Sequence, residues 1–233
     1  MLQKVSLFFL AIVTIIPCYI KYKRLKEKFN QELLFKQRHN CVVMYNTDLG
    51  MSGWPPYKKR IRPVITEENC LDVLYEPIIY FINTSTKTLD VAYMMISIPK
   101  IYDALIEACK RGVNVRLLMN FEHSKRDLNI IRKCIKEGMK VQLYITHLPD
   151  MSSIMHYKYM LKDYKEDGGY VLIGSMNLTR SAFLENYEDI VFTSDPYVST
   201  SLNENFENCW QYIEAENQTL LNKTILLDVN LFL

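Results

Sequence analysis

Residues 154–190, IMHYKYMLKDYKEDGGYVLIGSMNLTRSAFLENYEDI, contain the pattern from which the fold of this chain is inferred. The apolar, β-prone runs 154–161 and 170–173 flank a polar segment that contains two glycines, which is typical of a β-hairpin. His156 and Lys158 are two positions apart, so on a strand both side chains point to the same face. The stretch predicts a hairpin that presents an imidazole and an ammonium together at one end of a sheet.

The polar residues of this stretch suit phosphodiester chemistry. A neutral imidazole can attack phosphorus and leave again, and the phosphoryl oxygens need positive charge and hydrogen-bond donors around them. Lysine, serine and asparagine supply these without a metal ion, and a carboxylate can fix the histidine tautomer. The predicted catalytic residues are His156, Lys158 and Asp163, and the residues predicted to bind and orient the phosphate are Ser175, Asn177 and Glu188. We expect no metal and no cofactor.

These residues form an H-x-K-x4-D pattern, followed by Gly-Ser-x-Asn at 174–177 and Asn-x-Glu at 186–188. The arrangement resembles the HKD motif of the phospholipase D superfamily, from about Cys41 to about Glu214. One motif in a short chain with an apolar N-terminus is similar to the mitochondrial cardiolipin hydrolase group, which includes the Zucchini-type endonucleases of piRNA biogenesis. The chain departs from that group at residues 50–63, where the family carries a zinc-binding insert with several cysteines that is missing here.

Strand-like and helix-like segments alternate on both sides of the hairpin. We expect strands at 42–45, 88–95, 113–119, 141–144 and 187–192, and helices at 67–81, 100–111, 127–137 and 195–214. A loop is expected at 50–63. The alternation predicts an α/β fold, of phospholipase D type by the resemblance, with a mixed, mostly parallel sheet flanked by helices on both faces.

The N-terminal region differs in composition from the rest of the chain. Residues 5–20, VSLFFLAIVTIIPCYI, are close to the minimum length for a bilayer span. Residues 21–38 carry seven Lys or Arg against two Glu, a net charge of +5, whereas the chain from residue 39 onward has a net charge of −4. A basic flank after the span favours a cytosolic domain on a single-pass anchor. A cleaved signal peptide is the alternative interpretation.

These features predict four parts of the chain: an N-terminal transmembrane anchor at 1–22, a basic juxtamembrane spacer at 23–39, a catalytic domain at 40–215 and an apolar C-terminal tail at 216–233. The tail either packs on the domain or touches the membrane. The expected location is the mitochondrial outer membrane with the domain facing the cytosol, and the endoplasmic reticulum is the alternative.

The resemblance implies a membrane-anchored phosphodiesterase that acts through a phosphohistidine intermediate. The resemblance to the Zucchini-type endonucleases places a single-strand-specific endoribonuclease of piRNA biogenesis first, and Trp54, Tyr57 and the neighbouring lysines are suited to bind single-stranded RNA. The alternatives are a cardiolipin hydrolase that produces phosphatidic acid and, from another class, a non-catalytic scaffold. The reaction uses two imidazoles and the chain has one motif, so we expect a homodimer in which each copy contributes His156.

Overall fold

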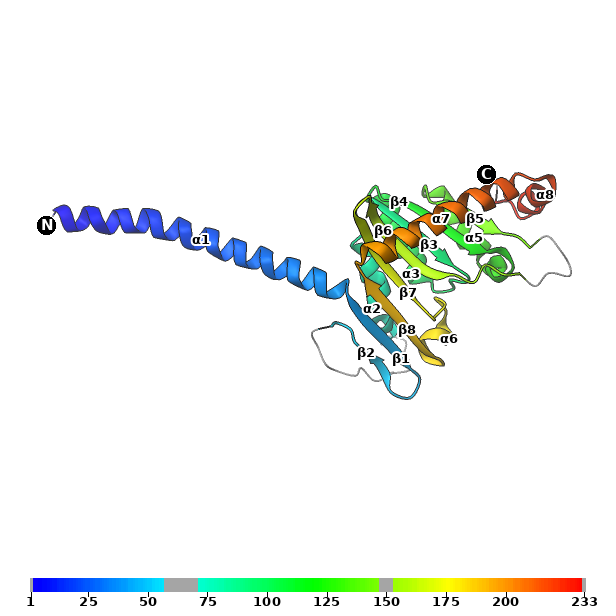
Figure 1. Ribbon diagram of the computed structural model, residues 1–233, viewed down its shortest axis with the longest axis horizontal. Helices are drawn as coiled ribbons and strands as arrows, with labels where there is room; N and C mark the ends of the chain where they lie inside the picture. Colours follow the sequence, from blue (N-terminus) through cyan, green and yellow to red (C-terminus); the bar gives the residue numbers. More distant parts are fainter. Residues whose placement is uncertain (1, 57–70, 147–152, 232–233) are drawn as a thin grey trace. The chain divides into compact units, whose positions relative to one another are not determined.

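The computed structural model describes residues 2–56, 71–146 and 153–231, and the chain divides into two compact units, 1–38 and 39–233. The first unit is one helix, α1 (Leu2–Arg38) (Figure 1). No helix within the described ranges combines the length and the apolarity that crossing a membrane requires. The predicted anchor at residues 5–20 is therefore not confirmed.

The second unit is built on an eight-stranded sheet with the order β2-β1-β8-β7-β6-β3-β4-β5. Figure 1 shows the strands β8, β7 and β6 side by side in the middle of this sheet. The strands are β1 (Cys41–Asn46), β2 (Gly50–Ser52), β3 (Thr88–Tyr93), β4 (Asn114–Asn120), β5 (Lys140–Tyr144), β6 (Lys158–Lys165), β7 (Gly168–Gly174) and β8 (Tyr187–Thr193). The predicted hairpin is β6–β7, with the two residues 166–167 between its strands.

The prediction of a mostly parallel sheet is wrong. Among the described strands, β3–β4 and β4–β5 pair in parallel, and the other five neighbouring pairs are antiparallel. Parallel neighbours need a long crossover connection, whereas antiparallel neighbours can be joined by a tight turn. The crossovers in this sheet are the helices that join β3 to β4 and β4 to β5, so the strand–helix alternation described only one half of the sheet.

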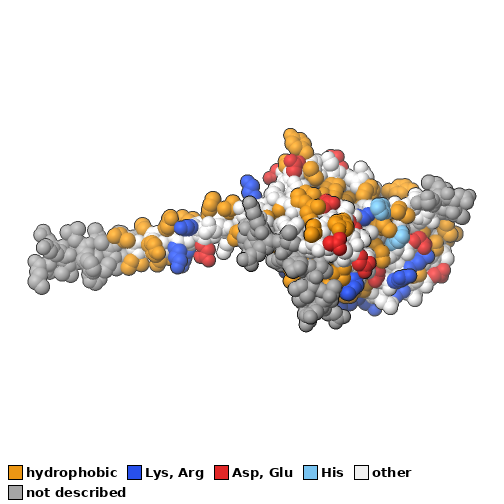
Figure 2. All heavy atoms as spheres, turned by 90° about the horizontal axis from the view of Figure 1, so that it is seen from below, with side chains coloured by type: hydrophobic (Ala, Val, Ile, Leu, Met, Phe, Trp, Pro, Cys, Tyr) orange, Lys and Arg blue, Asp and Glu red, His pale blue; other side chains and the backbone are white. Residues whose placement is uncertain are grey.

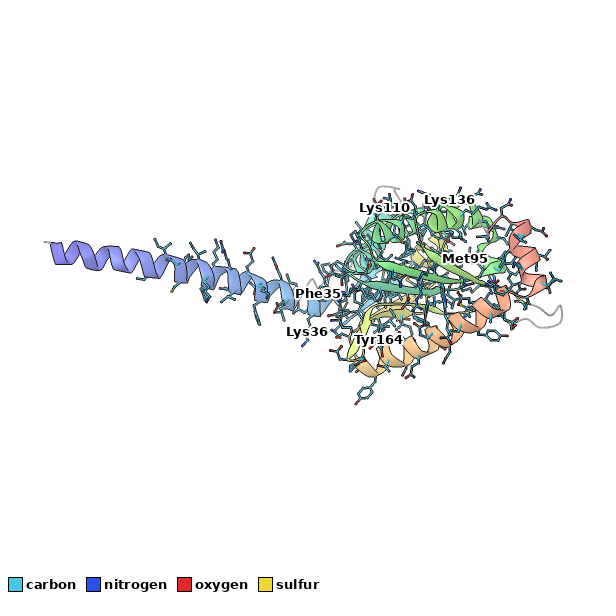
Figure 3. All side chains as sticks on the ribbon, turned by 90° about the horizontal axis from the view of Figure 1, so that it is seen from above. Phe35, Lys36, Met95, Lys110, Lys136 and Tyr164 are labelled. Carbon is cyan, nitrogen blue, oxygen red and sulfur yellow. The ribbon has the colours of Figure 1, made fainter. Side chains whose placement is uncertain are left out.

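Helices cover both faces of the sheet, as predicted. Figure 3 shows α3 and α5 on one side and α7 on the other. The helices of this unit are α2 (Leu71–Asn83), α3 (Pro99–Lys110), α4 (Phe121–Ser124), α5 (Leu128–Lys136), α6 (Arg180–Leu184), α7 (Pro196–Asn217) and α8 (Leu220–Asp228), with the 3₁₀ helix η2 (Lys125–Asp127).

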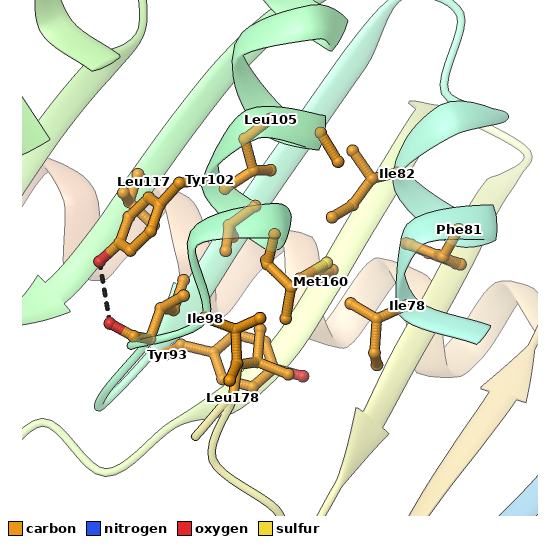
Figure 4. Packing of buried hydrophobic residues seen from close by; sticks show 14 of the residues in the cluster. Ile78, Phe81, Ile82, Tyr93, Ile98, Tyr102, Leu105, Leu117, Met160 and Leu178 are labelled. Carbon is orange, nitrogen blue, oxygen red and sulfur yellow. Dashed lines mark hydrogen bonds between the residues drawn. The ribbon is translucent and has the colours of Figure 1, made fainter. Parts of the chain in front are cut away.

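The larger part of the core lies between the sheet and the α2–α3 pair (Figure 4). The side chains of Phe81, Leu105 and Met160 are fully buried there, and the Tyr102 hydroxyl donates a hydrogen bond to the Ile96 carbonyl at 3.0 Å, the dashed line in Figure 4. A second cluster of buried side chains, which includes Phe206 and Trp210 of α7, packs against the opposite face of the sheet.

One segment differs from its expected structure, and the tail takes one of its two expected positions. Gly50–Ser52 pairs with β1 as a strand instead of forming part of a loop, and the nearby Trp54 is 1% exposed and stacks on Phe192 with 5.4 Å between ring centroids. The C-terminal tail packs on the domain, because Leu226 and Leu231 join the core and Arg132 Nε donates to the Val229 carbonyl at 3.2 Å. Tyr57 and the basic residues at 58–62 lie outside the described residues.

Candidate active site

The end of β6 brings the predicted nucleophile and its cation together. The Lys158 ammonium nitrogen lies 3.2 Å from Nδ1 and 3.1 Å from Nε2 of His156, and it donates to the His156 carbonyl at 3.2 Å. The Met94 N–H donates to the Tyr157 carbonyl at 2.8 Å and holds this segment beside the end of β3. Burial lowers the pKa of Lys158, and the Glu188 carboxylate opposes that shift. The site therefore holds a partly desolvated cation in contact with an exposed imidazole.

Ser175 and Glu188 meet beside this pair, where β7 ends and β8 begins. The Ser175 hydroxyl donates to the Glu188 carboxylate and accepts from the Asp189 N–H at 3.1 Å. The other carboxylate oxygen of Glu188 accepts from the Asn186 amide at 2.9 Å. A carboxylate such as Glu188 could fix the histidine tautomer, but the hydrogen bonds of Glu188 in the described chain go to Ser175 and Asn186. Its carboxylate acts on the site through its charge near Lys158.

Gly174 makes this approach of β7 to β8 possible. It is paired with Ile190, and a Cβ atom at position 174 would lie 2.0 Å from the Asp189 carbonyl oxygen, well inside contact distance. The next residue is Ser175, whose N–H donates to the same carbonyl at 3.1 Å. Glycine is thus required on steric grounds at the first position of the Gly-Ser-x-Asn pattern, because a side chain there would push the serine away from Glu188.

Asn177 follows β7, and its amide oxygen is buried without a hydrogen-bond partner among the described residues. Its neighbour Leu178 donates to the Met95 carbonyl at 3.1 Å, one residue from the Met94 N–H that holds Tyr157. The segments that carry His156 and Asn177 are therefore both hydrogen-bonded to residues 94–95. Buried polar atoms are normally paired, and an amide oxygen can only accept a hydrogen bond, so this atom would pair with a donor and not with a phosphate oxygen.

Asp163 does not join the other predicted catalytic residues. It lies five positions after Lys158 along β6, about 16 Å away at the rise of a strand. Its carboxylate accepts hydrogen bonds from the backbone N–H groups of Thr86, Lys87 and Thr88 at 2.6–3.2 Å. The structure therefore does not bring Asp163 to His156 and Lys158, and its carboxylate holds the loop that enters β3; a catalytic role for it stays a prediction.

Lys162, on the same strand, is a buried ionisable residue that the sequence pattern did not single out. Its side chain is fully buried, donates to the Phe81 carbonyl at 3.0 Å and lies over the Phe81 ring. Burial lowers its pKa to about 7, and the charge of Asp163 opposes this shift. Lys162 lies under α2 and away from His156, so it belongs to the core and not to the site.

A pocket of about 510 Å³ opens beside His156, on the side of the sheet that α7 covers. Its lining includes Tyr144, Met155 and Tyr157 from the sheet side and Tyr212 and Ile213 from α7. No Lys, Arg, Asp or Glu of the described chain lines it. On the face shown in Figure 2, histidine side chains border hydrophobic ones. The nucleophile thus stands at the boundary between a polar cluster and an apolar pocket.

Comparison with known proteins agrees with this geometry. Residues 78–210 match the family model described as cardiolipin synthase, PLD-like domain. Two relatives are named mitochondrial cardiolipin hydrolase. The one from Chlamydomonas reinhardtii is 28% identical over 56% of this chain and 54% of its own length. The one from Xenopus tropicalis is 24% identical over 82% of this chain and 81% of its own length. The chain thus matches about half of the Chlamydomonas protein.

A solved structure of a phospholipase D family member from Salmonella typhimurium superposes with a TM-score of 0.51 at 22% identity. The superposition covers 63% of this chain and 90% of that one.

Proposed function

Since the chain belongs to the family of the cardiolipin synthase PLD-like domain, as its HKD motif predicted, we propose that it is a phosphodiesterase with His156 as nucleophile. A ring nitrogen of His156 attacks phosphorus, the P–N bond forms and the P–O bond to the leaving alcohol breaks, which gives a phosphohistidine. Water then attacks the phosphorus, a new P–O bond forms and the P–N bond breaks. The products are a phosphomonoester and an alcohol.

The observation that carries this function is the contact between the Lys158 ammonium and both ring nitrogens of His156. A phosphate oxygen next to the imidazole would meet that cation, and such a charge stabilises the transition state most where water is excluded. The NH2 group of the Asn177 side chain, two residues after Ser175, is proposed to donate a further hydrogen bond to the phosphate. Ser175, held by Glu188, is the other polar group proposed to orient the phosphate.

The leaving alkoxide needs a proton, and a second imidazole is the proposed donor. It passes the proton to the leaving oxygen and recovers one from the attacking water, so the protons balance over the two steps. A homodimer with a two-fold axis through the site supplies this imidazole as the His156 of a second copy.

For the substrate, the apolar pocket beside His156 favours a phospholipid. An acyl chain next to the scissile phosphate fits a cavity of about 510 Å³ with aromatic and aliphatic walls and no charged side chain among its described lining residues. The relatives' name supplies cardiolipin as the candidate lipid, with phosphatidic acid as the product. This reverses the order expected from the sequence, because Trp54, one of the residues that favoured RNA, is 1% exposed and lies in the core.

A single-strand-specific endoribonuclease of piRNA biogenesis is the second candidate. Tyr157 follows the nucleophile directly and is 37% exposed, so its ring is a surface on which a base could stack. The net charge of −4 beyond residue 38 disfavours this substrate relative to a lipid. A scaffold without catalytic activity is the remaining alternative, and it predicts no turnover on any phosphodiester.

The test uses the full-length chain with bis(4-nitrophenyl) phosphate, cardiolipin vesicles and single-stranded RNA. His156→Ala should lower turnover on every active substrate by about 10³-fold or more, and acid quenching should trap a phosphorylated wild-type protein. EDTA should leave turnover unchanged, since the proposed mechanism uses no metal. Absence of turnover on all three substrates would refute the phosphodiesterase function. RNA cleavage without lipid hydrolysis would favour the endoribonuclease over the cardiolipin hydrolase.

The pocket's role has its own variant. Ile154, a pocket residue, and Val42, on β1, are both 48% exposed, so Ile154→Arg and Val42→Arg introduce the same charge at the same exposure. Ile154→Arg should reduce hydrolysis of cardiolipin about tenfold while hydrolysis of bis(4-nitrophenyl) phosphate stays unchanged, and Val42→Arg should affect neither. Equal effects of the two variants on cardiolipin would contradict an acyl-chain pocket.

The proposed location is the mitochondrial outer membrane, with residues 5–20 as a single-pass anchor and the second unit in the cytosol. The relatives' name supports the organelle. Imaging of residues 1–40 fused to a fluorescent protein tests the location, and a diffuse cytosolic signal would contradict the anchor.

A further inference from the structure

The residues of the segment 156–159 alternate between two faces of the sheet. His156 and Lys158 contact each other on one face. Tyr157 and Tyr159 point to the other face, where their rings meet edge to face with centroids 5.7 Å apart. A rotation of this short segment about its own axis would move both pairs at once, because successive side chains of an extended chain are fixed on opposite sides.

One side chain of α7 bridges the two tyrosines. The Asn205 amide oxygen accepts a hydrogen bond from the Tyr157 hydroxyl at 3.2 Å, and the amide nitrogen donates to the Tyr159 hydroxyl at 3.1 Å. Cys209, one turn further along α7, has its sulfur 3.8 Å from both the Tyr157 hydroxyl and the Asn205 oxygen. Both ends of the carboxamide are thus used on the two residues that flank Lys158.

The helix that carries Asn205 is itself tied to the sheet. The next residue, Phe206, is fully buried, and Glu207 accepts hydrogen bonds from the Arg116 guanidinium at 2.6 and 3.1 Å. Arg116 also donates to Asp90 of β3 at 2.6 Å and stacks over the Phe206 ring. Asn205 is therefore held in place by its neighbours, and the two tyrosines are held by Asn205.

We propose that Asn205 is a positioning residue for the reaction at His156. By fixing the Tyr157 and Tyr159 hydroxyls it sets the rotation of the segment and keeps the His156 ring and the Lys158 ammonium in contact on the opposite face. It touches no substrate, and its effect reaches the phosphate only through these two residues. This role rests on the proposed phosphodiesterase function.

A set of single substitutions tests it with bis(4-nitrophenyl) phosphate, a small substrate. Asn205→Leu removes both hydrogen bonds at similar volume and should lower kcat about tenfold or more with little change in KM, because small misplacements of reacting groups cost catalysis heavily. Asn205→Asp should restore most of kcat, because both tyrosine hydroxyls can donate to a carboxylate. Asn203→Leu, on the same helix, is the matched control and should leave kcat unchanged, since Asn203 makes no side-chain hydrogen bond in the described structure.

Two hydroxyl deletions keep the test valid if Asn205→Leu fails to fold. Tyr157→Phe and Tyr159→Phe each remove one oxygen and should each lower kcat, and adding Asn205→Leu to the double tyrosine variant should cause no further loss. Unchanged kcat in Asn205→Leu or in both tyrosine variants would overturn the positioning role while wild-type turnover upheld the phosphodiesterase. A loss of thermal stability with wild-type kcat would assign Asn205 to packing alone. A wild-type protein without turnover would refute both.

Discussion

Asp163→Ala is expected to lower the free energy of unfolding by about 3 kcal/mol, while the folded protein keeps its phosphodiesterase turnover. The Asp163 carboxylate accepts from three consecutive N–H groups at 2.6–3.2 Å. A hydrogen bond to a charged group contributes about 1.5–3 kcal/mol to stability. Most of these contacts are exposed, so water replaces part of them when they are lost. We therefore expect the loss of all of them to lower the free energy of unfolding by about 2 kcal/mol. Residue 163 also has a φ of 51°, where alanine costs about 1 kcal/mol more than aspartate.

Three substitutions separate the two contributions. Asp163→Asn keeps an acceptor and tolerates the left-handed backbone, Asp163→Gly keeps only the backbone tolerance, and Asp163→Ala keeps neither. Urea unfolding should rank their stabilities Asn, Gly, Ala, with about 1 kcal/mol between the last two. Turnover of bis(4-nitrophenyl) phosphate by the folded fraction should match the wild type in all three. Loss of turnover in Asp163→Ala without loss of stability would refute this reasoning and return Asp163 to the catalytic set.

Gly174→Ala should separate β7 from β8, because its Cβ would lie 2.0 Å from the Asp189 carbonyl oxygen; a variant with wild-type thermal stability and turnover would contradict this. The free energy of unfolding should rise between pH 7 and 10.5 by up to about 1.4 kcal/mol per unit, because in that window Lys162 binds a proton only when unfolded. Urea titrations of Lys162→Met should lack this increment, and an identical slope in both proteins would refute it. Heterodimers of wild-type and His156→Ala subunits should be inert, whereas half of the wild-type turnover per dimer would mean that each subunit works alone. His123→Ala tests whether the second imidazole comes from the same chain, because β4, which precedes His123, ends at the same end of the strands as the site. This variant should leave turnover unchanged.

The sequence predicted the parts of the site that depend on local geometry. His156 and Lys158 meet because their spacing of two matches the repeat of an extended chain. Asp163 belongs to the same motif, but the strand that aligns the first two residues carries the third away from them. The sheet was mispredicted for a related reason: strand–helix alternation reports short-range connections, whereas the antiparallel partners of β1 and β6 are chosen by contacts between distant segments.

Residues that act across the sheet left no pattern to read. Asn205 lies 46 positions from Tyr159 and on a different type of element, and an asparagine on a polar helix gives no sign of its partners. Trp54 was expected in the substrate groove because it lies in a loop rich in glycine, proline and basic residues. The β1–β2 pairing instead turns it inward onto Phe192, and only the folded sheet reveals that choice.

The pairing of β1 with β8 sets the order in which the protein can mature. Tyr45 lies opposite Glu188, 143 positions later, so the sheet stays incomplete until β8 has left the ribosome. Contacts of this separation slow folding, and in the meantime β1 presents an unpaired edge that invites aggregation. The same strand, β8, joins β1 to β7 and places Glu188 beside Ser175 and Lys158. A chain that terminates before β8 would therefore lack the link between β1 and β7 and part of its site together, so such products should have no hydrolytic activity and should be substrates for chaperones or proteases.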